Sequence, residues 1–79
     1  MPQSIETLDL RGLLCPLTWA RTKYALSKLA AGAELRVILD HRPALPDIKR
    51  NTEEIGDEVL SSRETDPGVF EMVLRKCAH

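Results

Sequence analysis

The sequence predicts an α/β two-layer sandwich of order βαβαββ, in which two helices cover one face of a four-stranded mixed sheet. Two segments of alternating apolar and polar side chains flank a stretch of helical period, which is typical of a βαβ unit. A second helical stretch and two strand-like segments joined by a Pro-Gly turn complete the order. The length of 79 residues suits a single domain, expected to span 1–79.

The first half of the chain predicts the βαβ unit. Residues 5–10 alternate as a half-buried strand does, and residues 34–39 alternate again. A helix is expected between them, starting at Pro16 and ending before Gly32. Because such a crossover joins parallel strands, both strands should end at the same edge of the sheet. The predicted apolar face of this helix consists of Trp19, Ala20, Tyr24, Ala25 or Leu26, and Leu29.

The second half predicts a helix followed by a hairpin. A loop with two prolines leads into a helix over 47–55, which Gly56 ends. The side chains expected on its buried face are Leu45, Ile48, Thr52 and Ile55. A weak polar strand, a turn and a stronger strand are expected over 58–64, 65–68 and 69–75. The last strand should therefore run antiparallel to the first.

Composition and charge narrow the class of protein. Lys and Arg number 11 against 12 Asp and Glu, and the net charge of -1 gives no basic field for direct nucleic-acid binding. No apolar run is long enough to span a membrane, and no signal-peptide pattern is present. The two cysteines form no disulfide framework. We expect a soluble, cytoplasmic protein with an aliphatic core and a free thiol, and nothing demands more than a monomer.

Cys15 is the leading candidate for chemistry. It stands between Gly12, which should break the first strand, and Pro16, which is tolerated at the first helical position, so Cys15 is the predicted N-cap. Unpaired backbone N–H groups and the helix dipole favour the thiolate at this position. The neighbouring Arg11 adds positive charge, and no acid is adjacent. The alternative is an inert thiol that packs as a small hydrophobe beneath the helix.

Three further residues are predicted to share the site with Cys15. Asp40 and His41 follow the second strand, at the sheet edge that carries the thiol. His41 either stabilises the thiolate or faces solvent as an ordinary loop histidine. Thr18, predicted at the third helical position, has a hydroxyl that either faces the sulfur or bonds locally. Its backbone N–H is expected to donate to the sulfur and lower the pKa of the thiol.

Other candidate groups are weaker. Cys77 should lie at the opposite edge from Cys15, too far for a disulfide, whose Cα atoms lie within ~7 Å. No cofactor and no metal are expected, because the ligand spacing of structural zinc sites is missing among Cys15, His41, Cys77 and His79. Six basic residues either make the Cys15 edge positive or form an ordinary solvated face: Arg11, Arg21, Lys23, Arg42, Lys49 and Arg50.

A longer motif surrounds the cysteine and continues along the chain. It reads Asp9-x-Arg11-Gly12-Leu13-x-Cys15-Pro16, then Lys23, Leu29 and Gly32, and further on Asp40, Asp47-Ile48 and Gly56-x-Glu58-Val59. This pattern resembles the TusA/SirA-like sulfur carriers over nearly the whole chain. That family usually has Cys-Pro-x-Pro, where this sequence has Thr18, and often a tryptophan in the second helix, where it has Asn51.

The resemblance implies the same βαβαββ fold and a sulfur carrier with sulfurtransferase-type chemistry, in which Cys15 bears a persulfide. The implied partners are a protein sulfur donor, such as a cysteine desulfurase or rhodanese, and a protein acceptor. The end product stays open among a thiolated tRNA base, a cofactor, an oxidised sulfur species and selenium handling. Two other classes also stay open, namely a non-catalytic interaction or regulatory module and a small thiol redox protein.

Overall fold

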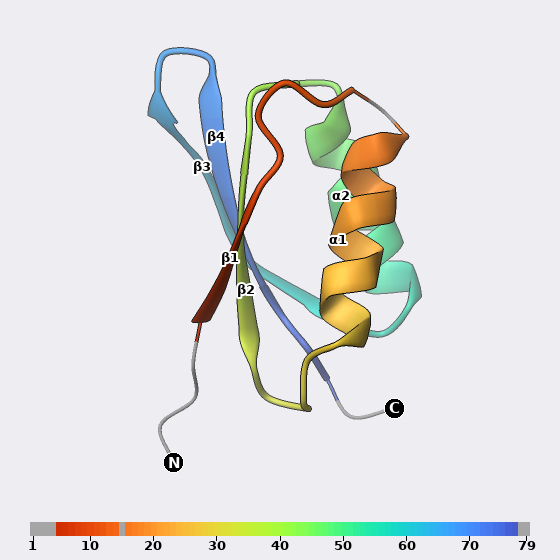
Figure 1. Cartoon of the computed structure of the whole chain (residues 1–79). Helices are drawn as coiled ribbons and strands as arrows, with labels where there is room; N and C mark the ends of the chain where they lie inside the picture. Colours follow the sequence, from red (N-terminus) through yellow and green to blue (C-terminus); the bar gives the residue numbers. More distant parts are fainter. Residues whose placement is uncertain (1–4, 15, 78–79) are drawn as a thin grey trace.

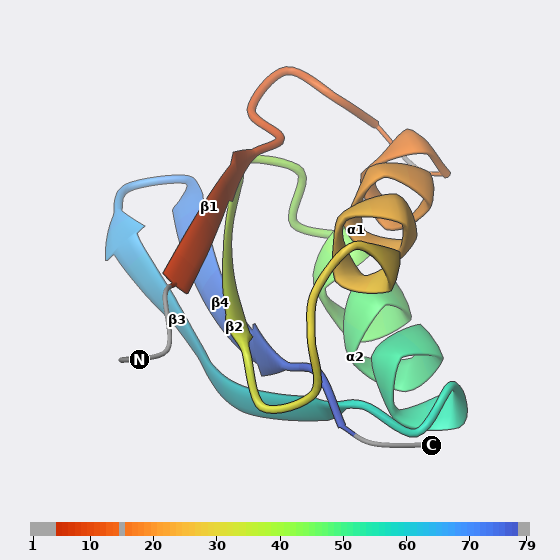
Figure 2. The same cartoon turned by 60° about the horizontal axis from the view of Figure 1, so that its bottom comes forward.

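A computed structural model describes residues 5–14 and 16–77 and confirms the predicted βαβαββ order. The elements are β1 (Ile5–Asp9), α1 (Leu17–Ser27), β2 (Glu34–Leu39), α2 (Ala44–Glu54), β3 (Glu58–Asp66) and β4 (Val69–Arg75). Both helices cover the same face of the sheet, as Figure 1 shows, and they lie side by side in the turned view of Figure 2. The molecule is therefore the predicted two-layer sandwich. Among the described residues, no helix is long and apolar enough to cross a membrane.

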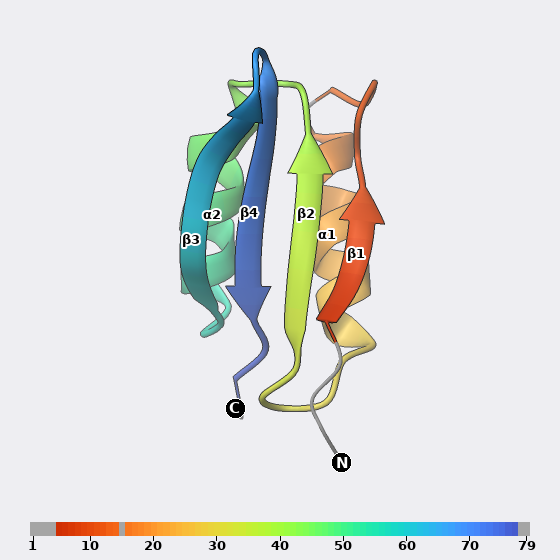
Figure 3. The same cartoon turned by 90° about the vertical axis from the view of Figure 1, so that its left-hand side faces the viewer.

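The sheet has the strand order β1-β2-β4-β3, which can be followed in Figure 3. β1 and β2 pair in parallel, with Ile5 opposite Glu34 and Asp9 opposite Ile38. β4 runs antiparallel to both of its neighbours, β2 and β3. The last strand is thus antiparallel to the first, as predicted. Cys77, which follows β4, lies at the end of the sheet where β1 and β2 begin.

The core is aliphatic and lies between the sheet and the helices. Alternate residues of β2 and β4 are buried, which follows from the two-residue period of a strand. Burying each large aliphatic side chain contributes roughly 1.5–3 kcal/mol relative to leaving it exposed. The buried apolar residues are Leu10, Leu26, Leu35, Val37, Leu39, Ala44, Ile48, Phe70, Met72 and Leu74.

The predicted apolar face of α1 is right in part: Leu26 is buried, and Trp19, Ala25 and Leu29 pack against the core, but Ala20 and Tyr24 are exposed and two threonines are buried instead. The buried side chains of this helix are Thr18, Thr22 and Leu26, whereas Tyr24 is 63% exposed. Trp19 is half-buried and packs against the core. Threonine is tolerated on the buried face because its hydroxyl can bond within the helix, and the Thr22 hydroxyl donates to the Thr18 carbonyl at 2.7 Å.

The buried face of α2 agrees better with the prediction. Ile48 and Thr52 are buried, and Leu45 and Ile55 are half-buried against the core. The helix starts at Ala44 and not at residue 47, because Pro43 fits the N-cap and Pro46 is tolerated in the first turn, where its missing N–H breaks no intrahelical bond.

Most of the other boundaries differ by one or two residues. α1 starts at Leu17, so its N-cap is Pro16 and not the predicted Cys15, and Pro16 is not the first helical residue. The helix ends at Ser27, well before Gly32, where its end was expected. β1 ends at Asp9. β3 continues to Asp66, so the hairpin turn is shorter than expected, and Gly68 takes a positive φ of 76° there.

Replacing Leu26 with alanine tests the corrected face of α1. Leu26 is fully buried, so L26A should lower the free energy of unfolding by about 2–5 kcal/mol through lost burial and the cavity left behind. Tyr24 belongs to the face that the sequence favoured, but its side chain is exposed and its ring forms a cation–π pair with Lys28. Y24A should therefore change stability by at most about 1 kcal/mol. Urea unfolding followed by circular dichroism measures both values, and equal losses would contradict this packing.

Candidate functional site

The chain leaves β1 through a tight turn that points it toward α1. The Leu10 N–H donates to the Ile38 carbonyl at 2.6 Å, which extends the pairing of β1 with β2 by one residue. The Leu13 N–H then donates to the Leu10 carbonyl at 3.1 Å and closes the turn. Gly12 within it has a φ of 87°, a left-handed conformation that glycine adopts without strain. A Cβ there would meet no atom within 4 Å, so conformation and not space favours glycine.

A side chain from the next loop holds this turn. The Asp40 carboxylate accepts a hydrogen bond of 3.0 Å from the Gly12 N–H, across 28 residues of sequence. Asp40 follows β2 as Gly12 follows β1, and the parallel pairing brings the two loops to one end of the sheet (Figure 1). Asp40 was predicted at the sheet edge that carries Cys15, and the structure places it at the end of the sheet where β1 and β2 finish, bonded to Gly12. Their hydrogen bond fixes the turn that leads to Cys15, which itself lies outside the described residues.

Arg11 is paired with an acid in this turn. Its guanidinium donates to the Asp9 carboxylate through Nε at 3.0 Å and through Nη2 at 2.8 Å, and its backbone N–H donates to the same group at 3.0 Å. These hydrogen bonds lower the pKa of Asp9 to about 2. The sequence-based prediction considered no acid adjacent to Cys15 and did not include the ion pair of Arg11 with Asp9. The positive charge of Arg11 is thus largely offset by a neighbour two residues away.

The start of α1 presents backbone donors next to the cysteine position. Pro16 is exposed and directly precedes the helix, and its carbonyl accepts from the Ala20 N–H at 3.1 Å. The Leu17 N–H donates to the Leu14 carbonyl at 2.9 Å. Thr18 is at the second helical position and not the third, and its side chain is fully buried. Its backbone therefore belongs to the helix start, while its side chain belongs to the core.

The predicted basic edge is only partly present. Three of the six basic residues named above form ion pairs: Arg11 with Asp9, Lys49 with Glu53 at 3.1 Å, and Arg50 with Asp47 at 3.1 Å. Arg42 lies over the Phe70 ring, 5.7 Å from its centroid. Within 5–14 and 16–77, only Arg21, Lys23 and Arg42 of this set lack an ion pair.

His41 lies beside Asp40 on the β2–α2 loop and is half-buried. Its carbonyl accepts from the Ala44 N–H at 3.0 Å and so helps to start α2. The structure places His41 at the predicted end of the sheet. Its role toward the Cys15 thiol stays a prediction, because Cys15 is outside the described residues.

Two exposed leucines are a feature that the sequence reasoning missed. Leu14 is 62% exposed and Leu17 is 53% exposed, and they flank Cys15-Pro16 in the sequence. Large apolar side chains exposed on both sides of one short segment are a feature of surfaces that contact other proteins. The helical period could have indicated that Leu17 is exposed, because this residue lies one position before the buried stripe that starts at Thr18.

Cys77 occupies an acidic environment at the other end of the sheet. It is half-buried, its N–H donates to the Asp57 carboxylate at 3.1 Å, and its thiol donates to the Glu58 carboxylate at 3.4 Å. Burial raises the pKa of the Cys77 thiol, and the hydrogen bond and charge of Glu58 raise it further, whereas Arg75 opposes them. Cys77 is therefore a protonated thiol at neutral pH, which is the unreactive form.

In the described part of the chain, no three His, Cys, Asp or Glu side chains gather closely enough to hold a metal ion. Cys15 and His79, two of the four residues weighed for zinc, lie outside the described residues.

Comparison with known proteins finds relatives that match this chain from β1 to β4. A family model described as Sulfurtransferase TusA matches residues 6–76, from β1 to just beyond β4. The chain belongs to the TusA family. This confirms the resemblance to TusA/SirA-like sulfur carriers drawn from the motif around Cys15.

Relatives and a solved structure agree with the TusA assignment. The chain is 41% identical over 71 residues to a candidate sulfur carrier protein of Archaeoglobus fulgidus, covering 90% of this chain and 81% of that protein. It is 31% identical over 71 residues to the sulfur carrier protein TusA of Allochromatium vinosum, covering 90% and 92% of the two chains. A crystal structure of a SirA-like protein from Desulfitobacterium hafniense superposes with a TM-score of 0.82 at 29% identity, over 95% of this chain and 100% of that chain.

Replacing Asp40 tests whether its carboxylate holds the turn. D40A removes the acceptor of the Gly12 N–H, so hydrogen exchange of the Gly12 amide should become about tenfold faster, as for the loss of one charge-assisted hydrogen bond. D40N keeps an acceptor oxygen at the same position and should change the rate much less. Amide exchange followed by NMR measures both variants. Equal rates in the wild type and D40A would contradict the proposed restraint.

Replacing Glu58 tests the environment of Cys77. In a C15S background, the alkylation of Cys77 by iodoacetamide should rise with pH, with a midpoint above the ordinary thiol value of ~8.5. E58Q removes the carboxylate and frees Arg75 from its ion pair with Glu58, and both changes favour the thiolate. The midpoint should therefore move down. E53Q on α2 is the control, and an unshifted midpoint in E58Q would refute the argument.

Proposed function

We propose that this TusA-family protein carries sulfur as a persulfide on Cys15, which it receives from a protein donor and passes to a protein acceptor. The observation that carries the proposal is the position of Cys15 in the sequence. It directly follows a turn held by the Gly12–Asp40 hydrogen bond and directly precedes the cap of α1. Membership of a sulfur-carrier family supports the same residue.

The transfer requires no oxidant and no general base. The Cys15 thiolate attacks the outer sulfur of a donor persulfide, a new S–S bond forms, and the donor leaves as its own thiolate. The persulfide proton goes to solvent, which leaves Cys15 as an anionic S–S⁻ group. An acceptor thiolate then attacks that outer sulfur, and Cys15 leaves as the thiolate. Both steps exchange one S–S bond for another, so the electrons balance.

The amino end of α1 supports the anion at each stage. A helix of 11 residues places partial positive charge at its first turn, where backbone N–H groups bind anions. The Thr18 N–H belongs to this first turn and is our candidate donor to the sulfur. A proline at this position would have no such N–H. We therefore retain Thr18, together with Pro16, Arg11, Gly12, Asp40 and His41, as residues that support the site.

The surface around this end suits a protein partner more than a nucleic acid. Exposed Leu14 and Leu17 offer apolar contact, and Arg21 and Lys23 add positive charge that attracts acidic surfaces. We place the relay in the reducing cytoplasm, where a free thiol persists. In this scheme the protein acts as a monomer and contacts neither nucleic acid nor membrane. Thiolation of a tRNA base is one end product that such a relay can serve.

A sulfur-loading assay tests the proposal. The wild type is incubated with a cysteine desulfurase and labelled cysteine, and peptide mass spectrometry without reductant locates any added sulfur. We expect one sulfur atom on Cys15, no label in C15S, and unchanged labelling in C77S, because Cys77 is protonated and at the other end of the sheet. Label on Cys77 alone, or label that survives in C15S, would overturn the assignment.

The loading assay together with a redox titration separates the alternative functions. A regulatory module would remain unlabelled with every donor tried. A thiol redox protein would show a reduction potential that depends on both cysteines and would lose it in C77S.

A further inference from the structure

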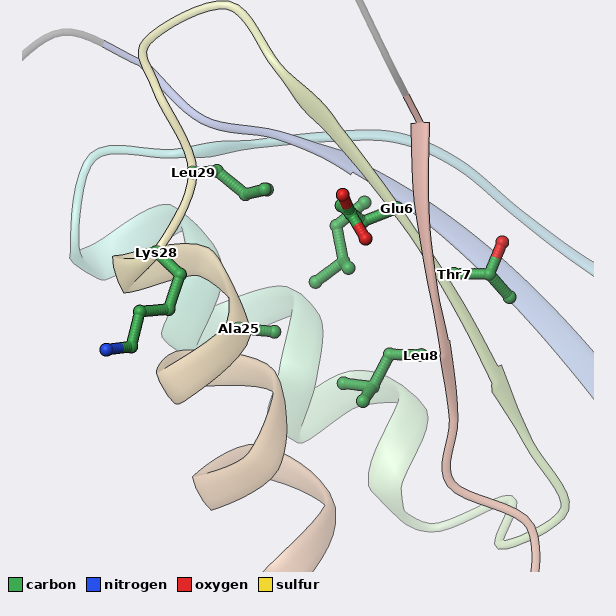
Figure 4. Close-up of a pocket in the computed structure, with 7 residues that line it drawn as sticks. Glu6, Thr7, Leu8, Ala25, Lys28 and Leu29 are labelled. Atoms are coloured by element: carbon green, nitrogen blue, oxygen red, sulfur yellow. The ribbon is translucent and has the colours of Figure 1, made fainter.

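A cavity of about 350 Å3 opens between β1 and the C-terminal half of α1, apart from the loop that leads to Cys15. Leu8, Ala25, Leu29 and Leu35 contribute apolar walls, and Glu6 contributes a carboxylate. Figure 4 shows the side chains of Glu6, Leu8, Ala25 and Leu29 extending into the space between β1 and α1. The volume falls in the range of small-ligand sites, about 300–1,000 Å3.

The register of the sheet explains why Glu6 points into this space. Glu6 lies opposite Leu35, and Leu8 lies opposite Val37, in the parallel pairing of β1 with β2. Residues paired in this way point to the same face of the sheet. Leu35 and Val37 are buried beneath the helices, so Glu6 also faces the helix layer. The acid of β1 therefore lines this space, and because Glu6 is an exposed residue, its carboxylate remains accessible to a ligand from solvent.

Glu6 has no partner in the described part of the chain, within 5–14 and 16–77. Lys28 is the cation of the lining, but its ammonium lies 5.0 Å from the centroid of the Tyr24 ring. Figure 4 shows the Lys28 side chain extending away from the cavity. An inward charge on an edge strand discourages pairing with other sheets, yet that role needs no cavity with apolar walls.

We propose that this cavity binds a short alkylammonium group. The ammonium pairs with the Glu6 carboxylate, and the methylene chain packs against Leu8, Ala25 and Leu29. A neutral alkyl chain would desolvate the carboxylate without compensation, and an alkyl carboxylate would be repelled by it. The inference is independent of the chemistry at Cys15, since the cavity lies at the other end of β1.

An NMR titration of the full chain with n-butylammonium chloride tests the site. Saturable shifts are expected at the amides of Leu8, Ala25 and Leu29. E6Q should weaken binding about fivefold, the loss expected for a partly exposed ion pair. E34Q is the matched control, because Glu34 is a strand glutamate opposite Ile5 in the register. Its substitution should leave the affinity unchanged.

Related probes separate the contribution of charge to binding from that of apolar contact, and they identify the source of the alkylammonium group. Butyrate and n-butanol at the same ionic strength should bind more weakly than n-butylammonium. Nα-acetyl-lysine amide keeps the side-chain ammonium and mimics a lysine within a polypeptide. Tighter binding of this compound would assign the alkylammonium to a polypeptide, and tighter binding of n-butylammonium would assign it to a free amine. Both results support the site. Equal affinity for butyrate, unchanged affinity in E6Q, or the absence of saturable shifts would overturn it.

Discussion

The parallel pairing of β1 with β2 is the constraint on which the site depends. Parallel strands need a crossover, and α1 supplies it, so the helix starts at the end of the sheet where both strands finish. That geometry brings Asp40 to Gly12 and holds the turn before Cys15. An antiparallel pair would carry the loop after β2 to the other end of the sheet. One topological choice therefore positions the turn, its anchoring carboxylate and the amino end of α1 together.

The buried threonines connect this site to the core. Thr18 contributes a backbone N–H at the start of α1, and its side chain is fully buried below that point. Its carbonyl accepts the hydroxyl of Thr22, which continues the same buried stripe one turn later. The position of the helix start is thus set by core packing and not by a surface loop alone. A residue that packs in the core can change the site through its backbone, without contacting the sulfur through its side chain.

The sequence alone predicted the bounds of an element correctly where the pattern depended on that element alone. β2 and β4 have the predicted bounds, because alternation in a buried strand is a local signal. The face of α1 could not be predicted in the same way. Thr22 is a polar residue, but its hydroxyl is paired within the helix and its side chain is buried, whereas the ring of Tyr24 is largely apolar and yet exposed. The pair of Arg11 with Asp9 was missed because counting charges does not assign partners. The meeting of Gly12 with Asp40 was predictable, because it follows from topology.

The two ends of the sheet differ in their electrostatic environment. Cys77 donates its thiol hydrogen to Glu58 and has Asp57 nearby, so burial and then negative charge raise the pKa of its thiol. The other end has a helix start and the paired Arg11–Asp9 turn, where an anion meets backbone donors. A relay needs one thiol that a partner can reach, since sulfur bound at a second thiol would be lost to the acceptor. In the proposed transfer, the acids around Cys77 would thus keep this thiol from competing for sulfur.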